Sequence, residues 1–207
     1  MLFVCLTLAA VPAMAQNDLY NNGPVNGTVD GYTINFGFTV SDSFHLSSPA
    51  TVNNMSFWAW LFVGDTLTSV EVQMGSAAFG NELFDQTVNL SASNCFMNNY
   101  GYNVCMESGS FSGPALGAGN YWVTLANASV PNGDPAFWDL NSGTGCTSPG
   151  CPSLAQENMA GTIFSEAFTL SGAATTTSTG TTPEPGSLLL FASGVLGLAG
   201  LLRRKMF

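Results

Sequence analysis

The stretch MSFWAWLFV, residues 55–63, decides the fold expected for this chain. It is apolar at every position except Ser56, it is rich in aromatic residues, and Gly64 and Asp65 punctuate its end. A short, continuous apolar run bounded by turn residues is typical of a strand at the centre of a sheet that is covered on both faces. We therefore predict a central, doubly covered strand here.

Shorter segments on both sides of this stretch alternate between apolar and polar residues, as half-buried strands do. In residues 31–40, for example, Tyr32, Ile34, Phe36 and Phe38 fall on one face. Similar reasoning predicts strands at 44–46, 67–74, 83–90, 104–111, 121–126 and 163–170. Eight short strands separated by turn residues predict an all-β sandwich, with a jelly roll as first choice and an immunoglobulin-like sandwich as second.

Other segments lack such patterns and are predicted to be connections. Residues 16–30 are polar and rich in Asn and Gly, so we expect a mobile lead-in. Residues 91–119 (apart from the strand at 104–111) and 131–152 are predicted loops. Residues 173–182, AATTTSTGTT, form an uncharged linker without core residues, so the folded ectodomain is expected over 16–172.

The charge distribution is strongly one-sided. All 13 acidic residues lie between Asp18 and Glu184, and the three basic residues, Arg203, Arg204 and Lys205, lie at the very end. The exported part therefore carries a formal charge near −13 and can form no ion pair with Lys or Arg. Nucleic-acid binding is excluded because no side chain there can neutralise phosphates. The charge favours solubility, with attraction of divalent cations or basic surfaces as the sharper alternative.

Four cysteines remain after removal of the first 15 residues, and they allow three pairings. The local pairing, Cys95–Cys105 and Cys146–Cys151, closes only two short loops and is the one we predict. Each bond would stabilise the fold by about 2–3 kcal/mol on the chain-entropy account. Zinc is not expected because no histidine lies near either pair.

Two features suggest ligand binding, and both have plainer explanations. The loop at 132–141 contains the oxygen ligands that Ca²⁺ takes, but Asn, Asp and Gly also form ordinary turns. Calcium in this loop is left open, and no metal or cofactor is otherwise predicted. The four tryptophans provide either a stacking platform for sugars or core residues; they are Trp58, Trp60, Trp122 and Trp138.

Catalysis is not expected. A Ser-His-Asp triad would have to use His45, which is the only histidine in the chain. A retaining glycosidase needs only two carboxylates about 5 Å apart, so a hydrolase stays as the weakest alternative. Its candidate residues are Glu71, Glu82, Glu107, Glu157 and Glu166.

The two ends of the chain carry targeting signals. Residues 1–15, MLFVCLTLAAVPAMA, have the apolar segment and the Ala-x-Ala cleavage site of a secretory signal peptide. No basic residue precedes the apolar segment, so either the amino terminus supplies the charge or the true start lies upstream. At the other end, Pro183, Glu184 and Pro185 precede a 16-residue uncharged run at 187–202, followed by the basic triplet.

The apolar run predicts one C-terminal transmembrane helix. As a helix it would span roughly 24 Å, against a bilayer core of about 30 Å. Snorkelling of the flanking basic side chains or local thinning of the lipid would accommodate the difference. The basic triplet then stops transfer and marks the cytoplasmic side.

Residues 183–207 resemble the PEP-CTERM sorting tail of exopolysaccharide-forming Gram-negative bacteria, a tail also labelled the C-terminal domain of ice-binding-type proteins. The resemblance covers about an eighth of the chain. It implies recognition and cleavage by an exosortase, an intramembrane cysteine peptidase, near Pro183, Glu184 and Pro185. The order of aromatic strands resembles, loosely, the jelly-roll ectodomains that often precede this tail.

We therefore expect an exported, non-enzymatic protein of the cell surface or extracellular matrix. It would pass through an inner-membrane intermediate and then be released from it. The alternative is a carbohydrate-binding module of the exopolysaccharide matrix.

Overall fold

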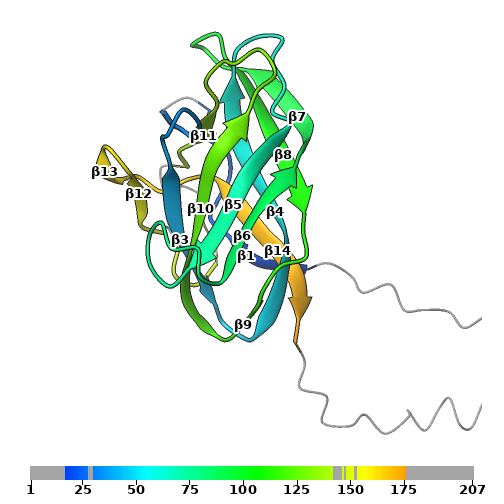
Figure 1. The fold of residues 1–207 in the computed structure, drawn as a ribbon, viewed down its shortest axis with the longest axis vertical. Helices are drawn as coiled ribbons and strands as arrows, with labels where there is room; N and C mark the ends of the chain where they lie inside the picture. The colour runs from blue at the N-terminus through cyan, green and yellow to red at the C-terminus, as the bar shows by residue number, and fades with distance from the viewer. Residues whose placement is uncertain (1–16, 28–29, 142–145, 147, 152, 176–207) are drawn as a thin grey trace, which may run out of the picture. The chain divides into compact units, whose positions relative to one another are not determined.

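The computed structural model describes residues 17–27, 30–141, 146, 148–151 and 153–175. In this part of the chain the fold is all-β, without a helix, and its 14 strands form two antiparallel sheets in a sandwich-like arrangement (Figure 1). The predicted signal peptide, the tail and its transmembrane segment at 187–202 lie outside the described residues. The described residues themselves include no helix long and apolar enough to cross a membrane.

The first sheet has eight strands and is built around the long strand β4. Its members are β1 (Asn17–Asn21), β2 (Gly31–Thr33), β4 (Ala50–Leu61), β7 (Ser91–Met97), β8 (Asn103–Ser110), β9 (Ala115–Leu116), β11 (Phe137–Asp139) and β14 (Phe168–Ala174). β4 pairs with β8 on one side and with β14 and β11 on the other. The apolar run that decides the fold thus lies at the centre of its sheet, as expected.

The second sheet has six strands in the order β13-β12-β3-β10-β5-β6. They are β3 (Val40–Leu46), β5 (Ser69–Gly75), β6 (Phe84–Asn89), β10 (Gly119–Ser129), β12 (Ala155–Glu157) and β13 (Gly161–Ile163). β10 lies between β3 and β5, and the short hairpin β12–β13 projects from the edge beside β3 (Figure 1).

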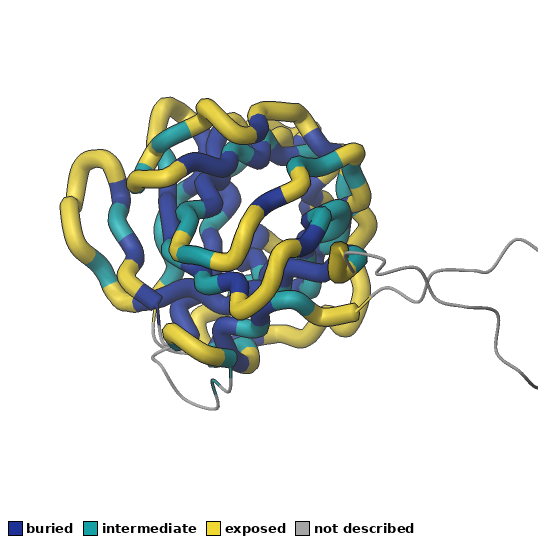
Figure 2. Tube along the Cα trace, turned by 90° about the horizontal axis from the view of Figure 1, so that it is seen from below, coloured by how far each residue is buried: buried dark blue, intermediate teal, exposed yellow. Residues whose placement is uncertain are grey.

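The hydrophobic core lies between the two sheets, and Figure 2 shows the buried positions gathered inside the ring of exposed loops. The core residues of β4 include Phe57, Ala59 and Leu61, and those of β5 are Val70, Val72 and Met74. The all-β sandwich is therefore confirmed, while the jelly-roll and immunoglobulin-like variants stay predictions.

The prediction for residues 31–40 was wrong in its middle. Only Gly31–Thr33 form a strand; a turn follows, and β3 begins at Val40. Phe38 donates its backbone N–H to the Asn35 carbonyl, and φ is +57° at Phe36 and +86° at Gly37. The Phe36 ring is 63% exposed instead of lying in the core. A tight turn interrupted what the alternation suggested was one strand.

Other boundaries also moved. The segment expected to be a mobile lead-in contains β1, which pairs with β14, and the loop-rich 91–119 contains the complete hairpin β7–β8. The expected loop at 131–152 contains β11. The last predicted strand, 163–170, in fact begins at Phe168 and runs to Ala174, so it takes the first two residues of the expected linker.

Candidate functional site

Aromatic side chains form a small pocket on the face of the first sheet that points away from the core. Its volume is about 140 Å³, and it is lined by Asp30, Gly31, Trp60, Tyr102 and Phe137. The Tyr102 ring centroid lies 5.6 Å from that of Trp60 and 5.7 Å from that of Phe137. We call this site the aromatic pocket.

Two further rings extend the rim of the aromatic pocket. Tyr100, which is 62% exposed, stacks on Trp60 with centroids 6.0 Å apart and an angle of 20° between the rings. Phe62 lies 5.1 Å from Tyr102 and is 40% exposed. The rim therefore presents apolar ring surface to solvent next to one exposed carboxylate, that of Asp30.

The turn between β7 and β8 positions the two tyrosines. The Asn98 side-chain oxygen accepts hydrogen bonds from the backbone N–H groups of Tyr100 and Tyr102, and Gly101 supplies the positive φ that the turn requires. Below the turn, the Cys95–Cys105 disulfide joins β7 to β8. The rings of Tyr100 and Tyr102 are thus held by the β7–β8 hairpin, which the disulfide cross-links.

Asp139 anchors Trp60 from behind. Its carboxylate accepts the indole N–H of Trp60 and the backbone N–H groups of Asn26 and Gly27. Burial raises the pKa of Asp139 to about 6, and these three hydrogen bonds oppose the shift. The indole under the pocket cannot swing out without losing a buried hydrogen bond to a carboxylate.

Two fully buried carboxylates lie close together elsewhere, and we call them the buried carboxylate pair. Asp42 is on β3, and Glu166 lies just before β14 and donates its backbone N–H to Asp42 Oδ2 at 2.7 Å. Burial raises the pKa of Asp42 to about 7. The pKa of Glu166 is raised well above its usual range, first by burial and then by the nearby charges of Asp42 and Asp139.

Neutral polar side chains surround the buried carboxylate pair. The Asn22 amide donates to Asp42 Oδ2, to the Ser165 hydroxyl and to the Glu166 carbonyl. The Asn22 oxygen accepts from the Tyr20 hydroxyl and the Ser153 backbone N–H. These bonds connect β1, β3 and the segment before β14, so the polar network ties the two sheets together.

The structure does not assemble a calcium site from the loop at 132–141. The Asn132 amide donates to Asp65, and the Asp139 carboxylate faces Trp60 and two backbone N–H groups. The Asn141 amide donates to the carbonyls of Asn22 and Glu166. In the described part of the chain, no three His, Cys, Asp or Glu residues are grouped to hold a metal ion.

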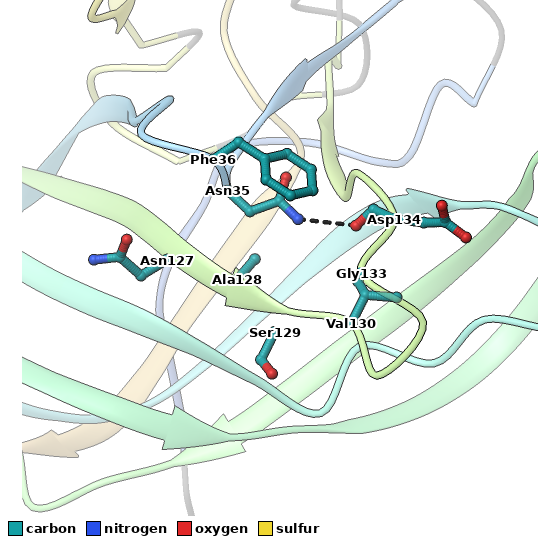
Figure 3. A pocket seen from close by; sticks show the side chains of 8 residues that line it. All are labelled: Asn35, Phe36, Asn127, Ala128, Ser129, Val130, Gly133 and Asp134. Atoms are coloured by element: carbon teal, nitrogen blue, oxygen red, sulfur yellow. Dashed lines mark hydrogen bonds between the residues drawn. The ribbon is translucent and has the colours of Figure 1, made fainter.

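A second pocket, of about 340 Å³, lies beside the turn that interrupts residues 31–40 (Figure 3). Its lining residues are Asn35, Phe36, Asn127, Ala128, Ser129, Val130, Gly133 and Asp134. The Asn35 amide donates to the backbone carbonyl of Asp134. The side-chain carboxylate of Asp134 points away from that bond in Figure 3. Its polar groups do not converge, so it is a weaker candidate than the aromatic pocket.

Two of the tryptophans, Trp60 and Trp138, are buried, but on opposite faces of the first sheet. Trp138 is fully buried and donates its indole N–H to the Ala167 carbonyl, while Trp60 forms a wall of the aromatic pocket. Trp58 and Trp122 are partly exposed, and Trp122 lines a third pocket of about 310 Å³. The sequence could not tell a platform from a core, and the structure contains both.

The candidate hydrolase residues have separate local partners or are buried in the described part of the structure. Glu107 on β8 and Glu166 are buried, Glu157 accepts the N–H groups of Met159 and Ala160, and Glu71 and Glu82 bind neighbours on or beside β5. His45 pairs with Asn120, at 2.8 Å between ring nitrogen and amide oxygen, and not with a serine.

Both disulfides have the local pairing that the spacing favours, Cys95–Cys105 and Cys146–Cys151. The second bond closes a loop in which the Ser148 hydroxyl accepts the Asn21 backbone N–H. That loop is thereby attached to β1.

Sequence reasoning missed several residues at these sites. The sequence predicts loops at Tyr100, Tyr102 and Phe137, although a Tyr-Gly-Tyr turn between two cysteines indicates exposed rings. Asp42 and Asn22 carried no signal, because an isolated polar residue is normally read as exposed.

Comparison with known families bears on the tail. A family model described as the PEP-CTERM protein-sorting motif matches residues 181–205. No curated protein matches the chain. The motif is recognised by exosortase, and it implies export and passage through the membrane to the cell surface. The sorting residues Pro183, Glu184 and Pro185 and the stop-transfer residues Arg203, Arg204 and Lys205 lie outside the described residues.

Proposed function

We propose that the chain is a non-enzymatic protein of the cell surface or extracellular matrix of a Gram-negative bacterium, released from the inner membrane by cleavage near Pro185. The sorting motif at 181–205 carries this proposal. A 16-residue apolar run is short for a permanent anchor and long enough to dock a substrate in the membrane. The prolines keep the adjacent backbone out of a helix, so a peptidase can reach it.

The intact mass of the surface fraction tests this proposal. The mature protein should end near Pro185, and replacing Pro183, Glu184 and Pro185 with alanine should trap full-length chain in the inner membrane. The control replaces three threonines of the linker, 175–177, with alanine and should leave processing unchanged. A wild-type surface protein that still contains Phe207 would show that the tail is a plain anchor.

A second candidate function is carbohydrate binding at the aromatic pocket. The carrying observation is the aromatic pocket, in which half-buried Tyr102 and Phe137 and exposed Tyr100 surround Trp60, itself only 6% exposed. Apolar ring faces beside a polar acceptor suit a sugar, which has apolar C–H faces and hydroxyl donors. The charge near −13 disfavours acidic polymers, so we propose a neutral polysaccharide.

Affinity electrophoresis of the full chain through neutral glucan and mannan gels, with an alginate gel beside them, tests the second candidate. Retardation in a neutral gel should fall at least tenfold in Tyr102→Ala, the loss expected for one aromatic contact of about 1.4 kcal/mol. Phe164→Ala, which removes an exposed ring that does not line the pocket, should bind like wild type. Equal retardation of both variants, or none for wild type, would rule the pocket out as the site.

A further inference from the structure

The buried carboxylate pair is unusual because its charge has no partner in the described part of the chain. Asp42 and Glu166 are both 0% exposed. Among the described residues, Asp42 Oδ1 and both carboxylate oxygens of Glu166 accept no hydrogen bond. An ionised carboxylate in such a place needs a cation or must take up a proton.

The described residues cannot supply that cation from their own side chains. No Lys or Arg occurs between Asp18 and Glu184, and the single histidine, His45, is hydrogen-bonded to Asn120. Further negative charge instead lies near, since Asp139 also raises the pKa of Glu166. The local field therefore favours an external cation.

The groups around the pair are oxygen ligands. The Ser153 hydroxyl is also buried and makes no hydrogen bond among the described residues by geometry, although it lies near enough to Asp42 to lower the pKa of that carboxyl. The Asn22 oxygen lies 3.3 Å from the Ser153 nitrogen. Two carboxylates with neutral oxygens and no histidine or free cysteine suit a hard cation such as Ca²⁺ and not a transition metal.

We propose that Asp42 and Glu166 bind one divalent cation of the hard, oxygen-preferring class, with Ca²⁺ as the best fit, between the two sheets of the sandwich. The ion would take the unpartnered oxygens of both carboxylates and of Ser153, and its charge would offset the repulsion between the acids. The site is not the 132–141 loop itself, although Asn141 of that loop donates hydrogen bonds to the Asn22 and Glu166 carbonyls beside the pair. It links β3 to the segment before β14, so occupancy stabilises the packing of the two sheets.

Calorimetry and thermal unfolding of the exported, oxidised full chain after EDTA treatment test the proposal. CaCl₂ should bind with a stoichiometry of one and a Kd on the order of 10⁻⁴–10⁻³ M or tighter, as in extracellular modules. At millimolar Ca²⁺ the Tm should rise by roughly 5 °C. Glu166→Gln and Asp42→Asn should each abolish both effects.

Two variants separate a built site from general charge effects. Glu107→Gln removes another buried, unpartnered carboxylate and should leave Ca²⁺ binding intact, as should exposed Glu82→Gln. If wild type binds no Ca²⁺, the pair is held by protons and the proposal is wrong. A Ca²⁺ response that persists in Glu166→Gln would equally overturn it, because the ion would then be acting on surface charge.

Discussion

Trp60 and Trp138 lie on neighbouring strands of one sheet, yet their rings are on opposite faces. In the register of β4 and β11, Phe137 lies opposite Trp60 and Trp138 lies opposite Ala59. Trp138 packs inside against Phe57 and Phe168, with ring centroids 6.0 and 5.6 Å away. Trp60 packs outside with Tyr100 and Tyr102.

We call Trp138, Phe57 and Phe168 the inner cluster, and Trp60, Tyr100 and Tyr102 the outer cluster. Their comparison shows that residue type alone does not tell whether an aromatic side chain contributes to stability or to binding. The inner cluster is fully buried, and its three rings, all from the first sheet, belong to the core between the two sheets. The outer cluster is supported by a stapled hairpin and is open to solvent. We therefore expect substitutions inside to change the free energy of unfolding, and substitutions outside to change ligand binding at small cost in stability.

The largest effect is expected for Trp138→Ala. Removal of a fully buried indole should lower the free energy of unfolding by about 3–5 kcal/mol, measured by urea titration. Partly exposed Trp122→Ala is the control and should cost clearly less. A loss below about 1 kcal/mol for Trp138→Ala would mean that the inner cluster does not hold the sheets together.

The Cys95–Cys105 bond should matter next. The double serine variant should lose about 2–3 kcal/mol, because the unfolded chain gains the freedom of a ten-residue loop. It should also weaken sugar binding, because the tyrosines of the outer cluster are on the hairpin that this bond closes. The matched variant lacks Cys146–Cys151 and should lose stability without losing binding. Equal sugar binding by both variants would show that the Cys95–Cys105 bond does not support the aromatic pocket.

Glu107 is on β8, the second strand of the β7–β8 hairpin. It lies opposite Phe57 of β4 on the face of the first sheet that points to the core. Burial raises its pKa from 4.5 to about 7, so folding favours the protonated carboxyl. The contribution of Glu107 to the stability of the fold is therefore complete below about pH 4, where the carboxyl is protonated. It is lost as the pH rises through 7 and the buried group ionises. Glu107→Gln should stabilise the protein by on the order of 2 kcal/mol at pH 8 and by almost nothing at pH 4.

Urea titrations of this variant at the two pH values provide the measurement. Glu82→Gln is the control, because hydrogen bonds from Ser76 lower the pKa of that exposed carboxyl. It should give no gain at pH 8. A Glu107→Gln gain that is independent of pH would show that packing, and not ionisation, is responsible.

The smallest effect concerns Phe36, a ring that belongs to neither cluster. It occupies a turn position with φ of +57° directly before Gly37 at +86°, where Asn-Gly is the preferred pair. Phe36→Asn should raise the free energy of unfolding by roughly 0.5–1 kcal/mol. Thermal unfolding of Phe36→Asn would measure this gain, with Phe164→Ala as the control. Destabilisation by Phe36→Asn would reveal a packing role for the Phe36 ring.

The sequence predicted best where burial leaves a pattern. β4, β5 and β10 alternate or run apolar, and all three were placed near their true positions. The run in β4 has the pattern of a doubly covered strand because Phe57, Ala59 and Leu61 face the core, while Trp58 and Trp60 face the other way under rings from the β7–β8 hairpin. Trp60 is left only 6% exposed.

Strands whose pairing leaves no pattern of buried and exposed residues could not be predicted from the sequence. Every residue of β7 is exposed, so no period could mark it as a strand. β1 is polar and is defined by its backbone bonds to β14. The turn at Asn35–Phe38 was hidden because aromatic residues happen to alternate across it.

The candidate sites depended on contacts between distant segments. Trp60 was named from sequence, but the tyrosines that complete its pocket follow about 40 positions later and reach it through the pairing of β4 with β8. Glu166 was named as a possible catalytic acid, and its burial beside Asp42 follows from the packing of two sheets. No local pattern encodes either arrangement.

The lack of Lys and Arg before residue 203 has a further consequence. Trypsin-like proteases cut after these two residues, so a chain processed near Pro185 offers them no cleavage site, whether it is folded or unfolded. Resistance of this kind depends on composition alone and survives denaturation, reduction and loss of any bound ion. It suits a protein that persists outside the cell among secreted proteases. It also means that surveys of surface proteins based on tryptic peptides would pass over the mature form, which a protease specific for Asp and Glu would reveal.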